Sequence, residues 1–195
     1  MARWTRGVDL DLFRPRSEPS ALVQGLAHPR FLYVGRVSVE KNVDAFLKLD
    51  LPGSKIVAGV GPALELLGRR FPDVRFVGVL EREQLAQLYS SVDAFVFPSL
   101  TDTFGLVMLE ALACGTPVAA FPVQGPLDVV GGSDAAALDT ELRRAALRAL
   151  RIDRARCRAW AERFSWQAAT EQFLAHQRWT GEAVASSCGA VVRPA

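Results

Sequence analysis

Two basic residues, Arg36 and Lys41, have the type and the spacing to hold an anion. They follow a short apolar run at residues 31–34 and Gly35, and Lys41 stands beside the start of an expected helix. A glycine lets the backbone approach a ligand, and two cations beside the positive end of a helix can hold a pyrophosphate. Taken alone, the pair is better explained as two solvated charges in a loop.

Two carboxylates, Asp102 and Glu110, follow a second apolar run at residues 94–97. Asp102 is expected in a loop at the mouth of a helix over residues 105–113, with Glu110 about two turns along it at ~1.5 Å per residue. The first can hold sugar hydroxyls, and the second can accept both hydrogens of a ribose diol. Backbone amides at this helix start would meet phosphate or sugar oxygens. Alternatively, Asp102 is an ordinary N-cap and Glu110 a surface residue.

Five apolar runs, each followed by a helical or loop segment, must position these side chains. The alternation predicts an α/β fold: a parallel sheet of about five or six strands, covered by helices on both faces. Ligands bind such a sheet beyond the carboxyl ends of its strands, where all four charged residues are expected. The expected strands are residues 31–34, 55–58, 74–77, 94–97 and 117–121, and the expected helices are residues 39–48, 63–70, 81–90 and 105–113.

The C-terminal part of the chain has a different pattern. A loop is expected at Gly125 and Pro126, and residues 140–179 are expected to be entirely helical, with Ser165 as the N-cap of the last helix. Arginines recur between residues 143 and 163, where they either meet anionic lipid or form a solvated helix face.

Composition excludes several classes of protein. The chain has 195 residues, of which 50% are hydrophobic and 23% charged, and a net charge of only +2, so we expect no nucleic-acid partner. Neither a membrane-spanning run nor a secretory signal is seen. The three cysteines have no CxxC spacing, which indicates a reducing, cytoplasmic compartment.

Other chemistries find little support in the sequence. The turn at residues 59–62 has two glycines but lacks the third glycine of a dinucleotide fingerprint, and it follows the second strand, which argues against a hydride-transfer enzyme. His28 and His176 have no metal-ligand spacing, and no GxSxG elbow is present.

The order of these motifs resembles the family 4 retaining glycosyltransferases of GT-B architecture, especially bacterial α-mannosyltransferase-like members. The resemblance covers most of the chain, from Arg6 to about Trp179. It is carried by the following segments: Arg6-Gly7-Val8-Asp9, Leu12-Phe13-Arg14-Pro15, Val34-Gly35-Arg36, Glu40-Lys41-Asn42, Gly59-Val60-Gly61-Pro62, Asp102-Thr103-Phe104-Gly105, Glu110-Ala111 and Gly115-Thr116-Pro117-Val118.

The resemblance implies a nucleotide-sugar site. Arg36 and Lys41 would bind the diphosphate, and Asp102, which stands where the family usually has glutamate, would contact the donor sugar. Glu110 would bind the ribose, and the turn at residues 77–80, including Val79, would line the base. Gly35, Thr103, Phe104, Gly105 and Leu106 complete the expected substrate contacts. No metal or other cofactor is expected, because the two cations and the helix end would neutralise the leaving diphosphate.

The resemblance also implies a Rossmann-like, donor-binding half of a GT-B fold. Residues 1–30 would be linker-like, residues 31–180 the nucleotide-sugar-binding domain, and residues 181–195 a flexible tail. The expected reaction is hexosyl transfer from GDP-mannose or a UDP-hexose with retention, by front-face attack. An acceptor-binding domain would arrive in trans or through a homodimer. The alternatives are an inactive remnant or partner subunit, and a nucleotide-sugar epimerase.

Two surface features follow from the same resemblance. Trp166, Phe173 and Trp179 of the last helix would face the acceptor-binding domain, so we expect them to form an exposed apolar patch in the isolated chain. Since lipid acceptors are common in the family, a cytoplasmic location with peripheral contact to the inner face of the membrane is the expectation for the arginine-rich helices.

Overall fold

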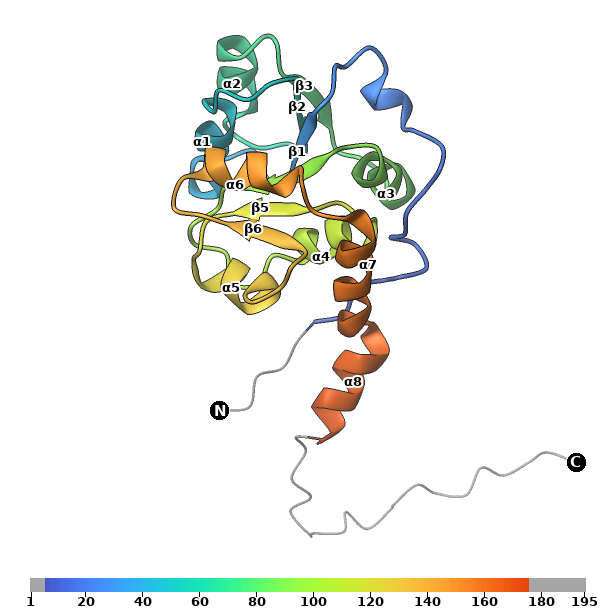
Figure 1. Ribbon diagram of the computed structural model, residues 1–195. Coiled ribbons are helices and arrows are strands. Elements are labelled where there is room, and N and C mark those ends of the chain that lie inside the picture. Colours follow the sequence, from blue (N-terminus) through green and yellow to red (C-terminus); the bar gives the residue numbers. More distant parts are fainter. Residues whose placement is uncertain (1–5, 176–195) are drawn as a thin grey trace, which may run out of the picture.

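The computed structural model describes residues 6–175, which form a six-stranded parallel sheet between two layers of helices (Figure 1). The strand order is β3-β2-β1-β4-β5-β6, and every neighbouring pair is parallel. The predicted α/β class is thereby confirmed. The strands are β1 Arg30–Val34, β2 Ser54–Ala58, β3 Arg75–Gly78, β4 Ala94–Phe97, β5 Val118–Ala120 and β6 Ala136–Leu138.

Helices cover both faces of the sheet. The core on one face includes buried residues of α3, α4, α5 and α7, and the core on the other face includes those of α1, α2 and α6 (Figure 1). The helices are α1 Val43–Leu47, α2 Leu64–Arg70, α3 Arg82–Ser90, α4 Leu106–Ala113, α5 Gln124–Val130, α6 Leu142–Ala149, α7 Arg154–Ala161 and α8 Trp166–Ala175, with 3₁₀ turns η1 Ala21–Val23, η2 Val39–Lys41 and η3 Glu162–Phe164.

The central strands are apolar throughout because both of their faces are buried. In β4, Phe95 and Phe97 pack into the core beneath α3 and α4, whereas Ala94 and Val96 pack into the core beneath α6. All four residues are at most 4% exposed. A continuous apolar run, rather than an alternating one, is what a parallel sheet between two helical layers requires.

Residues 39–48 form two short helices rather than the single helix that the sequence predicts. The break is at Asn42, whose backbone is left-handed with φ 54°. Its side-chain Nδ2 donates a hydrogen bond of 3.0 Å to the carbonyl oxygen of Pro98, in the loop after β4. This contact fixes η2, and hence Lys41, beside the loop that carries Asp102.

The loop expected at Gly125 and Pro126 is wrong, because both residues lie in the first turn of α5. Proline is tolerated there, since first-turn amides have no intrahelical acceptor. Gly125 packs directly on the loop after β4: a Cβ atom at this glycine would be 2.4 Å from the carbonyl oxygen of Asp102. The strand β6 follows α5 and was not among the five apolar runs.

The N-terminal segment expected to be linker-like packs against the domain. Phe13 and Val23 are at most 2% exposed. The guanidinium of Arg158 on α7 donates to the carbonyl oxygens of Leu10 and Phe13, and also to that of Ala113 at the end of α4. Residues 6–29 therefore contribute to the core, and the proposed domain boundaries remain a prediction.

The C-terminal helices carry the two predicted surface features. Ser165 caps α8 as predicted, accepting a 3.0 Å hydrogen bond from the amide of Ala168. Trp166 and Phe173 on α8 are 59% and 45% exposed, as expected for the apolar patch, whereas Trp179 lies outside the described residues. Among the described residues, no helix is long and apolar enough to cross a membrane.

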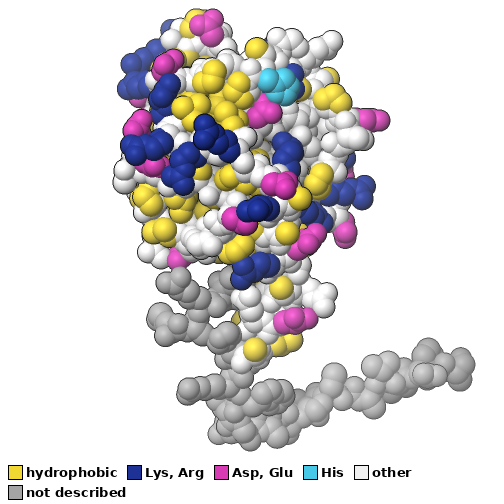
Figure 2. Space-filling view, viewed as in Figure 1, with side chains coloured by type: hydrophobic (Ala, Val, Ile, Leu, Met, Phe, Trp, Pro, Cys, Tyr) yellow, Lys and Arg dark blue, Asp and Glu magenta, His cyan; other side chains and the backbone are white. Residues whose placement is uncertain are grey.

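The arginines of α6 are largely paired with acidic side chains. Arg143 pairs with Asp50, Arg144 with Glu141 and Arg148 with Asp139. Basic and acidic side chains are accordingly interspersed on the face shown in Figure 2. This pairing favours the solvated helix face over the lipid-binding surface, and contact with a membrane remains a prediction.

Candidate functional site

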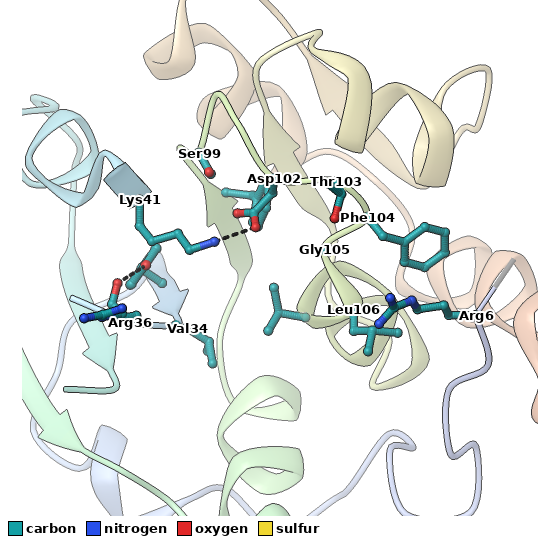
Figure 3. Close-up of a pocket in the computed structure, with 14 residues that line it drawn as sticks. Arg6, Val34, Arg36, Lys41, Ser99, Asp102, Thr103, Phe104, Gly105 and Leu106 are labelled. Carbon is teal, nitrogen blue, oxygen red and sulfur yellow. Dashed lines mark hydrogen bonds and ion pairs between the residues drawn. The ribbon is translucent and has the colours of Figure 1, made fainter. Parts of the chain in front are cut away.

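A pocket of about 310 Å³ lies at the carboxyl ends of β1 and β4, where the strand order reverses (Figure 3). This switch point is where open α/β sheets bind their ligands. The pocket brings together eight of the ten residues predicted from the sequence, which are Gly35, Arg36, Lys41, Asp102, Thr103, Phe104, Gly105 and Leu106. Glu110 and Val79 lie elsewhere.

An ion pair between Lys41 and Asp102 spans the pocket wall (Figure 3). The Lys41 Nζ atom donates to Asp102 Oδ1 at 2.5 Å, and the two side chains are only 31% and 21% exposed. Asp102 is not the N-cap of α4, because Gly105 holds that position. Its carboxylate therefore faces the pocket rather than the helix end.

The loop after β1 is held in place by a buried tyrosine. Tyr33 is 2% exposed, and its hydroxyl donates a 2.8 Å hydrogen bond to the carbonyl oxygen of Arg36. Burial raises the pKa of Tyr33, and the negative charges of Asp102 and Glu40 raise it further. The hydroxyl consequently stays protonated and keeps donating. The Arg36 guanidinium itself approaches Glu40 at 3.9 Å and is well exposed.

The loops after β1 and β2 lie in direct backbone contact. Val37 and Gly35 donate to the carbonyl oxygens of Val60 and Ala58, at 2.9 and 3.0 Å. A Cβ atom at Gly59 would be 2.0 Å from the carbonyl oxygen of Gly35. The glycines of the 59–62 turn thus serve loop packing, which positions Arg36.

Val79 lies in a second hollow of about 180 Å³ beside the first. Both hollows have Val34 and Gly35 in their lining, so they are neighbours at the end of β1. The remaining lining is apolar side chains and glycines, namely Ala58, Gly59, Gly78, Leu80 and Leu85. Val79 itself is 73% exposed. A flat apolar group such as a nucleobase suits this lining.

Glu110 lines neither hollow but is half-buried against α3. The hydroxyl of Tyr89 donates to its Oε2 atom at 3.4 Å. Burial raises the pKa of Glu110, while the hydrogen bond from Tyr89 and the charge of Arg82 oppose the rise. The surface-residue alternative for Glu110 is therefore not what the structure shows.

We expect Glu110→Gln to be at least as stable as the wild type at pH 7. Because the folded state raises this pKa, it binds the proton more tightly than the unfolded chain does. The contribution of Glu110 to the free energy of unfolding consequently falls as the pH rises from about 4.5, the ordinary value. Urea unfolding at pH 4, 5.5 and 7 should show a smaller fall in the free energy of unfolding for Glu110→Gln than for the wild type. Glu18→Gln replaces an exposed glutamate and is the control, so its pH dependence should match that of the wild type. A Glu110→Gln variant that is less stable than the wild type at pH 7 would contradict the burial argument.

Six residues that line the pocket were not among the predicted site residues, namely Arg6, Tyr33, Val34, Phe97, Ser99 and Val107. Ser99 is 1% exposed, and its Oγ atom has no hydrogen-bond partner among the described residues. Tyr33, Val34 and Phe97 were assigned to strands, Val107 was assigned to a helix, and Arg6 was noted only as part of a motif. Ser99 lies two residues after the end of β4, and this position was the signal that could have identified it.

No three His, Cys, Asp or Glu side chains gather as a metal-ligand group within residues 6–175. Cys114 and Cys157 are buried in the core, and burial raises the pKa of each thiol to about 12. Neither thiol is ionised near neutral pH, and neither lines the pocket. Whether the activity needs a metal stays a prediction.

The family model described as glycosyl transferases group 1 matches residues 28–151 of this chain. The chain belongs to this family. The match contains every predicted site residue and the lining of both hollows except Arg6. A sulfoquinovosyl transferase, SQD2 of Arabidopsis thaliana, is 36% identical over 137 residues, which are 65% of this chain and 27% of that protein.

Mycobacterial relatives match over more of the chain. The D-inositol 3-phosphate glycosyltransferase of Mycobacterium avium (strain 104) is 38% identical over 202 residues, covering 88% of this chain and 47% of the relative. A GDP-mannose-dependent alpha-(1-6)-phosphatidylinositol dimannoside mannosyltransferase of Mycobacterium tuberculosis (strain ATCC 25177 / H37Ra) is 31% identical over 203 residues, covering 94% of this chain and 53% of the relative. The chain thus spans about half the length of these relatives.

Solved structures give the same fold. Sucrose-phosphate synthase from Thermosynechococcus elongatus superposes with a TM-score of 0.76 at 29% identity, covering 87% of this chain and 50% of the other. Anabaena HepE, solved with UDP and glucose, superposes with a TM-score of 0.69 at 21% identity, covering 87% and 54%. The group 1 domain described here therefore has the fold of one Rossmann-like half of a GT-B enzyme.

Proposed function

We propose that this group 1 domain binds the nucleotide-sugar donor of a retaining hexosyltransferase, with GDP-mannose or a UDP-hexose as donor. The observation that carries the proposal is the Lys41–Asp102 pair, placed in a pocket at the switch point of the sheet and next to an apolar hollow. Each part of one nucleotide-sugar then has a partner in the site. The cation binds the diphosphate, the carboxylate binds the sugar, and the apolar hollow binds the base.

Lys41 and Arg36 bind the diphosphate of the donor in this proposal. As the bond between the anomeric carbon and the diphosphate oxygen breaks, its electron pair goes to the oxygen, and the two cations stabilise the negative charge that develops there. The acceptor hydroxyl oxygen forms the new bond on the face that the diphosphate leaves and gives its proton to the departing diphosphate oxygen, which retains the configuration. No described carboxylate is needed as a covalent nucleophile in this route.

Asp102 contacts the hydroxyl groups of the donor sugar. In the structure its carboxylate is paired with Lys41, so a bound diphosphate competes with Asp102 for the ammonium group. When the diphosphate takes Lys41, the carboxylate is free to accept hydrogen bonds from the sugar. Glu110, on the second turn of α4, is proposed for the ribose, and Val79 for the base.

The acceptor site is proposed to come from outside this domain. The chain spans about half of its relatives, and the names of several relatives specify glycosyl transfer to inositol phosphate or phosphatidylinositol mannosides. An N-terminal-type domain in trans or a second copy of the chain would complete the cleft. The domain itself is proposed to comprise residues 31–180.

Calorimetric titration with UDP, GDP, UDP-glucose and GDP-mannose tests the proposal. We expect one nucleotide series to bind, with the sugar conjugate binding more tightly than the free diphosphate. Asp102→Ala frees Lys41 and removes the sugar contact, so the free diphosphate should bind as tightly as in the wild type or more tightly, whereas the additional affinity for the sugar conjugate should be lost. A folded chain that binds neither series would overturn the proposal.

A further inference from the structure

A third cation, Arg6, lines the pocket on the side away from Lys41 (Figure 3). Figure 3 shows its guanidinium beside Leu106 and Phe104, at the start of α4. Lys41 is paired with Asp102, and Arg36 approaches Glu40. Within residues 6–175, by contrast, no carboxylate forms an ion pair with Arg6.

The backbone next to Arg6 is held firmly. The amide of Val8 donates a 2.8 Å hydrogen bond to the carbonyl oxygen of Phe164, and Val8 forms a bridge with Ser165. Gly7 packs on the first residue of α8, since a Cβ atom there would be 2.6 Å from the Cα of Trp166. Arg6 therefore extends toward the pocket from a fixed point rather than from a loose end.

The charges that face the pocket are unbalanced. Its lining contains Arg6, Arg36 and Lys41 but a single carboxylate, Asp102. The proposed diphosphate site uses the two cations that follow β1, and it leaves Arg6 on the opposite wall. Arginine binds carboxylate, sulfonate and phosphate groups through paired N–H donors, and apolar neighbours such as Phe104 and Leu106 strengthen such a contact.

We propose that Arg6 determines specificity for an acidic substrate, by pairing with a carboxylate, sulfonate or phosphate on the donor sugar or the acceptor. This inference rests on the proposed function, since it assumes that the diphosphate occupies the Arg36 and Lys41 side. The negative group would lie across the pocket from the diphosphate, so a neutral substrate would leave Arg6 without a partner.

Calorimetry with wild type, Arg6→Gln and the matched control Arg14→Gln tests the inference. Arg14 is an exposed arginine of the same segment that lines a different hollow. One arm compares UDP, UDP-glucose and UDP-glucuronate, or the GDP series if GDP is the nucleotide that binds. The other arm compares inositol with inositol 3-phosphate on the chain saturated with nucleoside diphosphate. Thermal unfolding confirms that all three proteins are folded.

If the acidic group is on the donor, wild type binds the glucuronate about five- to tenfold more tightly than the glucose conjugate, and Arg6→Gln loses this preference. If it is on the acceptor, the preference and its loss appear with inositol 3-phosphate instead. Arg14→Gln should behave as the wild type in both arms. The inference is overturned if Arg6→Gln changes neither arm, or if it weakens free UDP or GDP equally, which would make Arg6 part of the diphosphate site. Absence of all nucleotide binding by the wild type would instead overturn the proposed function, and the inference with it.

Discussion

Lys41→Met should bind nucleoside diphosphate about thirtyfold or more weakly than the wild type. Hydrogen bonds to charged groups contribute about 1.5–3 kcal/mol, and each 1.4 kcal/mol corresponds to a factor of about ten in affinity. Removing the ammonium also leaves Asp102 without its partner, 21% exposed at the pocket wall, where its charge repels the ligand. Both effects act in the same direction, and isothermal titration calorimetry measures their sum.

The double variant Lys41→Met/Asp102→Asn separates these two effects. If repulsion by the unpaired Asp102 contributes, the double variant recovers part of the affinity that Lys41→Met loses. Lys48→Met is the matched control. Lys48, at the C-terminal end of α1, is half-exposed and forms an ion pair with Asp44, and it does not line the pocket. Equal affinities for Lys41→Met and Lys48→Met would contradict the placement of Lys41 in a diphosphate site.

The sequence predicts this site well because strand ends are easy to locate. Each candidate followed an apolar run, and parallel strands bring their carboxyl ends to one edge of the sheet. Eight predicted residues meet in one pocket for that reason. The same reasoning could not place Glu110, since its position on the second turn of α4 does not say whether it faces the pocket or α3.

Local sequence patterns do not predict the backbone conformation where contacts between residues far apart in the sequence determine it. Asn42 interrupts a helix because its side chain bonds to Pro98, 56 residues away in sequence. Gly125 begins a helix that packs on the carbonyl oxygen of Asp102, although Gly-Pro is typical of loops. Arg6 faces the pocket only because its segment is bound to the start of α8. None of these contacts has a signature in neighbouring residues.

The glycine at position 59 illustrates a contact of this kind, and Gly59→Ala should destabilise the fold by about 3 kcal/mol or more. Its backbone has φ 133°, which L-residues rarely adopt, and the added Cβ would lie 2.0 Å from the carbonyl oxygen of Gly35. The neighbouring atom is backbone rather than a mobile side chain, so the loop after β1 must move. Urea unfolding monitored by circular dichroism gives the change in free energy.

Gly25→Ala distinguishes backbone strain from the close contact. Gly25 also has a positive φ, 77°, but its added Cβ would meet nothing within 4 Å, so only the strain of about 1 kcal/mol is expected. The difference between the two variants measures how tightly the loops after β1 and β2 are packed. Since the same displacement would shift Gly35 and Arg36, Gly59→Ala should also weaken nucleoside diphosphate binding under conditions where it remains folded, whereas Gly25→Ala should not. Equal stability of the two variants would mean that the loop after β1 moves away from the added Cβ atom at little cost in free energy.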